Sequence, residues 1–242
     1  MKICYVALLA GLLTACGGGG SGVVASTKSY SFVPPQAGSQ RTYNQTIIDN
    51  SNNTINETIR HTTNTVNSDG SYVVLQDDPS SNSYIVNGTN YSIVTETFTQ
   101  NKFGQEISYV YTPSGGSQTT CTLSPHGGGP DYPIAVGETW SLTYTLTCGS
   151  SAPISYSQTG NVVGVESVTV PAGTYSAVKL QTTTIWTGLS GTTYTNTETN
   201  WREANTGISI KRTISHSYTY SGTPPTNGHA VTTSAELSSG VL

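Results

Sequence analysis

Residues 140–148, WSLTYTLTC, decide the fold, because apolar and polar side chains alternate along them without a break. In an extended chain, one side would carry Trp140, Leu142, Tyr144, Leu146 and Cys148. The other side would carry only serine and threonine, and β-branched threonine suits the pleat of a sheet. This period of two is typical of a strand with one buried face.

The same period continues through the rest of the chain, and no stretch of ten residues repeats apolar positions at helical spacing. One face near the C-terminus carries Ile208, Ile210, Ile214 and Tyr218, and Arg212 and His216 interrupt it. Turn-forming pairs separate such runs, among them Asp69-Gly70, Asn87-Gly88, Ala172-Gly173 and Thr206-Gly207. We therefore expect an all-β fold, an antiparallel meander that forms a curved sheet or half-barrel.

Three signals recur in the same order and at nearly the same offset, which indicates two tandem repeats. The matched segments are 35–43 with 133–144, 70–76 with 173–181, and 95–104 with 197–207. The predicted repeats occupy residues 29–112 and 134–220, with a Gly- and Pro-rich linker at 113–133 and a tail or strand at 221–242. Each repeat has few large apolar residues, so a single shared sheet is favoured over two small barrels.

The N-terminal segment has the pattern of an export signal. Residues 1–15 contain Lys2 and an apolar run that is too short to span a membrane, which takes about 20 residues. Leu13, Thr14, Ala15 and Cys16 resemble the lipobox of bacterial lipoproteins. The glycines that follow make residues 16–28 a flexible tether after the lipidated cysteine.

The lipoprotein resemblance implies that Cys16 becomes the mature N-terminus and carries a diacylglycerol, with fatty chains such as palmitate. Several chains would hold the protein at a membrane, since each buried methylene contributes about 0.8 kcal/mol. Gly17 stands where inner-membrane lipoproteins usually have aspartate. The expected location is therefore the cell envelope, on the outer membrane.

Two cysteines remain in the exported part of the chain. Cys4 belongs to the signal and Cys16 to the anchor, which leaves Cys121 and Cys148. A pair of cysteines outside the cytoplasm predicts a disulfide. The alternative, a redox-active pair, favours closer spacing in a helical setting.

A family resemblance covers about residues 132–212, through Tyr132-Pro133, the run VGETW at 136–140, VTVPAGTY at 168–175, Trp201 and GISIK at 207–211. This stretch is similar to a group of uncharacterised bacterial exported proteins, some of them called TapB-like. The resemblance implies a curved antiparallel sheet like the half-barrels of lipoprotein and lipid carriers. It implies no activity and no catalytic residues. The segment 203–206 departs from the family pattern, so that loop is expected to differ.

The sequence contains no catalytic motif, and we expect no enzyme, no cofactor and no metal. His126 and Asp131 lie close in sequence but lack further ligands at metal spacing. Asp77, Asp78 and Pro79 are interpreted as a turn. Surface charges or an ion pair are expected at Glu166, Glu198, Arg202 and Glu203.

Two functional hypotheses remain. The formal net charge of −4 argues against nucleic acid as a partner. The first hypothesis is a non-enzymatic protein, anchored to the membrane, that binds an apolar ligand such as a lipid, or an envelope protein, with an apolar cavity between sheet and linker. The second is a structural or cell-surface interaction protein without a ligand cavity. Fifteen tyrosines against three phenylalanines suit a half-exposed groove or contact surface.

Overall fold

The computed structural model describes residues 28–77, 84–86, 89–91, 95–112, 117–188, 191–220 and 230–242. All regular elements in this part of the chain are β-strands, as the period of two predicts. The predicted lipidation site, Cys16, lies outside the described residues.

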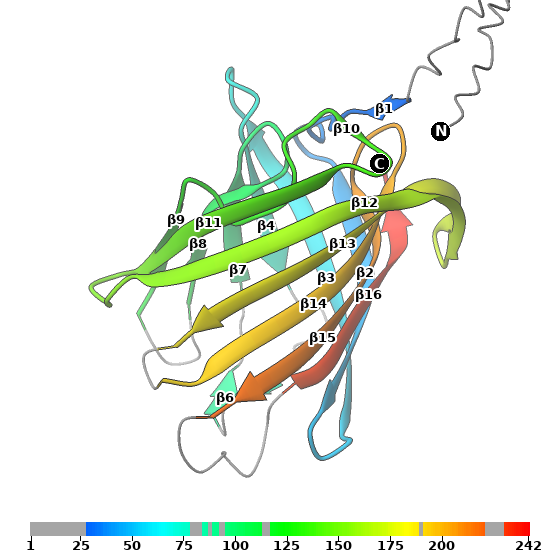
Figure 1. The fold of residues 1–242 in the computed structure, drawn as a ribbon. Helices are drawn as coiled ribbons and strands as arrows, with labels where there is room; N and C mark the ends of the chain where they lie inside the picture. Colours follow the sequence, from blue (N-terminus) through cyan, green and yellow to red (C-terminus); the bar gives the residue numbers. More distant parts are fainter. Residues whose placement is uncertain are drawn as a thin grey trace, which may run out of the picture.

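Twelve strands form one closed antiparallel barrel (Figure 1). Neighbours around it follow the order β11, β12, β13, β14, β15, β16, β2, β3, β4, β7, β8 and β9, and β9 pairs with β11. Chain order gives the bounds β2 (Gln40–Asp49), β3 (Thr54–Val66), β4 (Tyr72–Asp77), β7 (Thr95–Gln100), β8 (Glu106–Tyr111), β9 (Thr119–Ser124), β11 (Thr139–Cys148), β12 (Ile154–Val170), β13 (Gly173–Thr187), β14 (Thr193–Glu203), β15 (Ser209–Thr219) and β16 (Ala230–Gly240). A separate hairpin consists of β5 (Tyr84–Val86) and β6 (Thr89–Tyr91).

The expected open half-barrel is wrong, because two pairings close the sheet. Strand β9 lies inside the segment 113–133 that was predicted to be a linker, and it pairs with β8 and β11. Strand β16 lies in the segment 221–242, which was predicted to be a tail or strand, and pairs with β15 and β2. Closure satisfies the backbone groups that the edge strands of an open sheet would expose.

The strands fall into two series of equal number. The first consists of β2, β3, β4, β7, β8 and β9, and the second consists of β11 to β16. Each series follows one short strand, β1 (Ser29–Tyr30) or β10 (Ile134–Ala135), and these two pair with each other. Two repeats that share a core would produce this arrangement, although the duplication itself stays a prediction.

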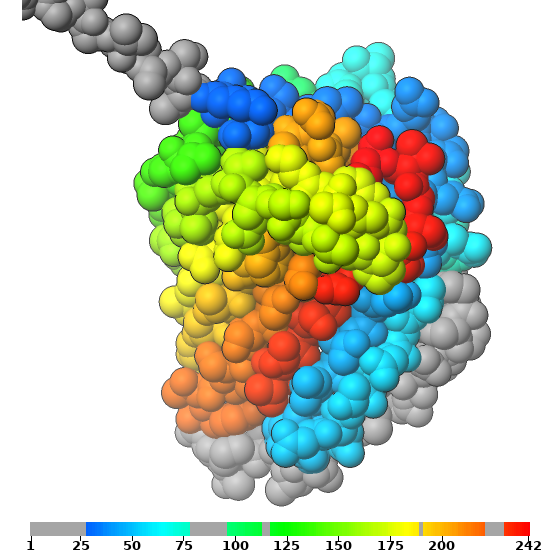
Figure 2. All heavy atoms as spheres, turned by 90° about the vertical axis from the view of Figure 1, so that its right-hand side faces the viewer, coloured from blue at the N-terminus to red at the C-terminus, as the bar shows by residue number. Residues whose placement is uncertain are grey.

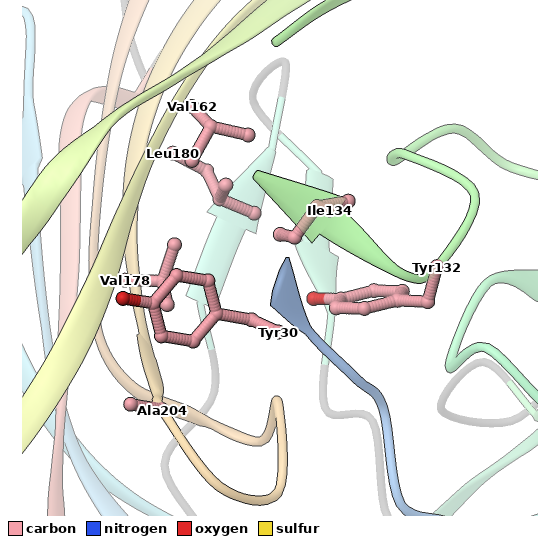
Figure 3. Packing of buried hydrophobic residues seen from close by; sticks show 7 residues of the cluster. All are labelled: Tyr30, Tyr132, Ile134, Val162, Val178, Leu180 and Ala204. Atoms are coloured by element: carbon pink, nitrogen blue, oxygen red, sulfur yellow. The ribbon is translucent and has the colours of Figure 1, made fainter. Parts of the chain in front are cut away.

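A plug formed by β1, β10 and their flanking residues fills one end of the barrel. Figure 3 shows Tyr30, Tyr132 and Ile134 of the plug facing wall residues Val162, Val178 and Leu180, with Ala204 beside them. Phe32 follows β1 and packs on Gly104 and Gly207, where a Cβ atom would come within 2.6 Å and 2.9 Å of its ring. Both glycines also have positive φ angles, so the backbone conformation as well as the contact with Phe32 favours glycine at these positions.

The long β12–β13 hairpin extends beyond the barrel and bends back over its outside. Figure 2 shows its yellow-green tip lying against the red strand β16. The backbone N–H of Ala172 donates to the carbonyl oxygen of Leu237 at 3.1 Å. Val168 and Val170 of the hairpin belong to a buried cluster that also contains Ile210. The hairpin thus contributes apolar side chains to a cluster that it shares with strands β15 and β16.

The disulfide predicted between Cys121 and Cys148 is present. The two residues are paired in register on β9 and β11, with their Cα atoms 4.0 Å apart. This pairing is one of the two seams between the two series of strands, and β16 with β2 is the other. The bond therefore crosslinks the barrel where the first half of the chain meets the second.

Candidate binding site in the barrel interior

A cavity of about 420 Å³ lies inside the barrel, below the plug. Strands β2, β3, β4, β7, β8, β14, β15 and β16 contribute to its wall, and Phe32 of the plug segment also lines it. Its apolar side chains are Phe32, Tyr43, Ile59, Tyr72, Val74, Phe98, Ile208 and Ala235. Its polar side chains are more numerous: Arg41, Gln45, His61, Gln76, Glu96, Gln100, Glu106, Asn200, Arg202, Ser209 and Arg212. The cavity differs from the expected one in place and in chemistry. It lies inside the barrel and not between the sheet and the linker, and its polar side chains outnumber its apolar ones.

The strand register explains why these residues share the interior. Directly paired residues of neighbouring antiparallel strands point to the same face. Arg41 is paired with His61, His61 with Gln76, and Gln76 with Glu96, which gives one inward row across β2, β3, β4 and β7. Asn200 is paired with Arg212 and Arg212 with Ala235 on the other wall.

A hydrogen-bonded chain connects His61 to Glu96. His61 Nε2 lies 2.8 Å from Gln76 Oε1, and Gln76 Nε2 donates to Glu96 Oε2 at 3.1 Å. Burial lowers the pKa of His61 to about 4, Arg41 and Arg212 lower it further, and the hydrogen bond that His61 donates to Gln76 opposes the shift. At neutral pH the ring is therefore uncharged, and its Nε2 carries the hydrogen that Gln76 accepts.

The two cavity carboxyls are poorly solvated. Burial raises the pKa of Glu96 to about 7. Burial and then the charge of Glu96 raise the pKa of Glu106 to about 7, with Arg212 opposing the shift. Both groups consequently change charge near neutral pH, because desolvation disfavours the carboxylate.

Three arginines supply the positive charge of the cavity. Arg41 is buried, with 6% of its surface exposed. Arg202 Nη1 donates to Tyr132 Oη at 3.3 Å and to the carbonyl oxygen of Gly207 at 3.4 Å, so the plug and the loop after β14 orient this guanidinium. Arg41, Arg212 and Arg202 all act electrostatically on Tyr43, which places their charges around one side chain.

An aromatic ladder lines the interior at the end of the barrel away from the plug. Adjacent strands β11 to β15 contribute one ring each: Tyr144, Tyr156, Trp186, Tyr194 and Tyr218. The first three contacts are stacked, with centroids 4.9, 5.0 and 4.9 Å apart, and the last is edge-on. Because these rings contact each other across neighbouring strands, the tyrosines of this ladder stabilise the barrel wall.

The residues singled out from sequence are not brought together. Asp78 and Pro79 lie outside the described residues. Asp131 accepts a hydrogen bond from Gln105 Nε2 at 3.1 Å, and the Nδ1 of His126 is buried without a partner in the described part of the chain. Asp77 pairs with Arg60 on β3. Neither His126 nor Asp131 lines the cavity.

The charges expected at the surface divide between the two faces of the barrel wall. Glu166 is on the outside, where it pairs with Lys179 at 3.5 Å and accepts from the Trp201 indole. Glu203 is buried and accepts from the backbone N–H groups of Asn205 and Thr206, so it orders the loop after β14. Arg202 lines the cavity, which corrects its assignment as a surface charge.

Within the described ranges, no group of three or more His, Cys, Asp or Glu side chains could hold a metal ion. The same part of the chain contains no helix that is long and apolar enough to cross a membrane.

No protein-family model matches the chain, and no curated protein matches it. The fold is similar to that of a Bacteroides fragilis NCTC 9343 protein described as exported and as having a YmcC-like fold. The TM-score is 0.51 at 12% identity, over 88% of this chain and 100% of the other. A Parabacteroides distasonis ATCC 8503 protein described as a lipoprotein gives a TM-score of 0.46 at 11% identity, with the same shares covered. At this identity the first likeness shows the fold alone.

Proposed function

We propose that this protein is a non-enzymatic binding protein of the bacterial envelope, which holds a small polar organic ligand inside its barrel. The observation that carries the proposal is the cavity of about 420 Å³ within a closed, plugged barrel. Its volume lies in the range of known ligand sites. The alternative, a structural module filled by its own side chains, expects no such space.

The lining chemistry favours a polar ligand over the apolar one expected from sequence. Buried polar groups need hydrogen-bond partners, and a hydrocarbon would offer none to the Nε groups of Arg41 and Arg202, which have no partner among the described residues. The apolar side chains, among them Ile59, Val74 and Phe98, can cover a ligand's carbon skeleton. A hydroxylated organic molecule fits this mixture better than a lipid chain.

The cellular address in this proposal rests on the N-terminal sequence. The lipobox that ends at Cys16 supports lipidation there, and Gly17 supports residence on the outer membrane. The description of the Bacteroides fragilis protein as exported agrees with an envelope location. Membership of the TapB-like group is part of the same proposal, based on residues 132–212. The partners would then be the membrane, through the anchor, and the ligand, with an envelope protein as a further candidate.

Filling the cavity should abolish binding. Ala235 lines the cavity from β16 and has 8% of its surface exposed, so Ala235→Phe would place a ring in the ligand space. The matched control is Val231→Phe on the same strand, where the native side chain is 39% exposed. After incubation with a polar small-molecule extract of bacterial envelopes, native mass spectrometry should detect a bound mass on the wild-type chain and on Val231→Phe. Ala235→Phe should retain at least tenfold less.

Circular dichroism would first establish that both variants are folded. Equal retention of the bound mass by Ala235→Phe and the control would place binding outside the cavity. A wild-type chain that retains no small molecule from the extract would contradict the proposed function.

A further inference from the structure

Two guanidinium groups in the cavity have a donor directed to no protein acceptor. The Nε atoms of Arg41 and Arg202 are buried, and neither has a hydrogen-bond partner among the described residues. Donors of this kind are rare, because an unsatisfied buried donor is costly to folding. Two unsatisfied buried donors around one cavity lower the stability of the fold, so stability does not explain why they are there.

The arginines are also not neutralised by contact with carboxylates. Among the described residues the ion pairs are Arg60 with Asp77, Lys179 with Glu166 and Lys211 with Glu236, and no cavity arginine takes part. Three glutamates on strands of the cavity wall accept hydrogen bonds from amide side chains. Gln45 donates to Glu57, and Asn200 Nδ2 donates to Glu198 Oε1 at 3.0 Å. Glu96 accepts from Gln76.

The two donors belong to one site. Arg41 on β2 and Arg202 on β14 both line the cavity, and both act electrostatically on Tyr72 as well as on Tyr43. Arg202 is held in place through its Nη1 by Tyr132 and Gly207. Its Nε is the donor that no described protein group satisfies. Arg212 adds a third positive charge on the neighbouring strand β15.

We propose that Arg41 and Arg202 form an anion subsite that binds a carboxylate or phosphate group of the ligand. This inference rests on the proposed function and names the chemical class of its ligand: a small organic acid or phosphate ester. Arginine suits the role because its planar fork matches both anions and keeps its charge when buried.

The test uses three small probes and the full chain. Sodium phosphate, sodium acetate and neutral acetamide would be titrated at constant ionic strength, with binding measured by calorimetry. Acetate and acetamide have nearly the same shape, so their difference reports the charge. Phosphate and acetate should bind the wild-type chain at least tenfold more tightly than acetamide, and comparing the two anions distinguishes a phosphate site from a carboxylate site.

Arg41→Met is the diagnostic variant. It should weaken the binding of the preferred anion by about ten- to a hundredfold, since hydrogen bonds to charged groups are strong. The control, Arg60→Met, also removes one positive charge, but from the ion pair with Asp77, and should bind the anion as the wild type does. Without anions, Arg41→Met should melt at the same temperature as the wild type or higher, because it removes a buried donor that has no partner.

Three results would overturn the anion subsite: acetamide binding as well as acetate, Arg41→Met keeping the anion affinity, or Arg41→Met melting lower without anions, which would make the arginine structural. Absence of any anion binding to the wild type would also refute it. The proposed function is tested separately by Ala235→Phe. A neutral envelope molecule that Ala235→Phe loses and Arg41→Met keeps would leave the binding function standing and the anion subsite wrong.

Discussion

Replacing both Glu96 and Glu106 with glutamine should raise the free energy of unfolding at pH 8 by on the order of 3 kcal/mol, and should leave it nearly unchanged at pH 4.5. Both carboxyls line the cavity, and burial raises the pKa of each to about 7. Glutamine keeps the shape of the protonated acid and cannot ionise. The gain should therefore appear only where the wild-type groups are charged.

The sign follows from the raised pKa values. In the unfolded chain each glutamate loses its proton around its ordinary pKa, 4.5, whereas in the barrel it keeps the proton until about pH 7. The folded state binds more protons over this interval, so wild-type stability falls as the pH rises from about 4.5 to about 7. Above that interval both states are ionised, and the cost of the buried charges is fully present.

His61 makes the free energy of unfolding depend on pH in the opposite direction, so its contribution has to be separated from that of the two glutamates. Burial is the main cause that lowers the pKa of His61 to about 4. As the pH falls from about 6.5 to 4, the unfolded chain takes up this proton before the folded chain does, so the stability of the fold decreases. Subtracting the urea-unfolding free energies of the wild type from those of the double variant at each pH cancels this common contribution. A difference that is the same at pH 4.5 and pH 8 would show that the carboxyls are solvated and do not face a buried cavity.

Ile134→Ala should lower the free energy of unfolding by about 2 to 5 kcal/mol, the usual range for truncating a fully buried isoleucine. Ile134 lies in the plug strand β10, is 1% exposed, and packs with Tyr30, Val162 and Leu180 (Figure 3). The truncated side chain would leave a hole between plug and wall that the closed barrel cannot easily collapse. Urea unfolding monitored by tryptophan fluorescence measures the loss.

The matched control is Val136→Ala, two residues along the same segment. Val136 is 46% exposed, so its truncation should change stability by less than about 0.5 kcal/mol. Equal, small effects of the two substitutions would mean that the plug does not pack inside the barrel. In that case the cavity would be open at this end.

The strands were predictable because alternation is a local property. Trp140 to Cys148 lie in β11 with the side-chain period that the sequence shows, and the disulfide follows from the two cysteines that remain outside the predicted signal and anchor. Barrel closure was not predictable, because it depends on β9 and β16. Strand β9 is short and lies in a Gly- and Pro-rich stretch, and β16 has the sequence AVTTSAELSSG, with few large apolar residues. Strand β9 pairs with its chain neighbours β8 and β11, but closure also needs β16 to pair with β2 from the other end of the chain, and no local pattern encodes that pairing.

The cavity was missed for a related reason. Arg212 and His216 interrupt the alternating face that carries Ile214 and Tyr218, and this face points inward. A charged residue on an otherwise apolar strand face is the signal that could have indicated a polar interior. Arg41 and His61 carry no such local mark. Their meeting depends on the register between β2 and β3.

The most direct test of the central account is a crystal structure of the full chain purified from bacterial envelopes. We expect a closed twelve-stranded barrel with electron density for a small molecule in the cavity, whose anionic group accepts hydrogen bonds from the Nε atoms of Arg41 and Arg202. An open sheet, or a barrel in which these arginines pair with glutamates of the chain and side chains fill the interior, would contradict it.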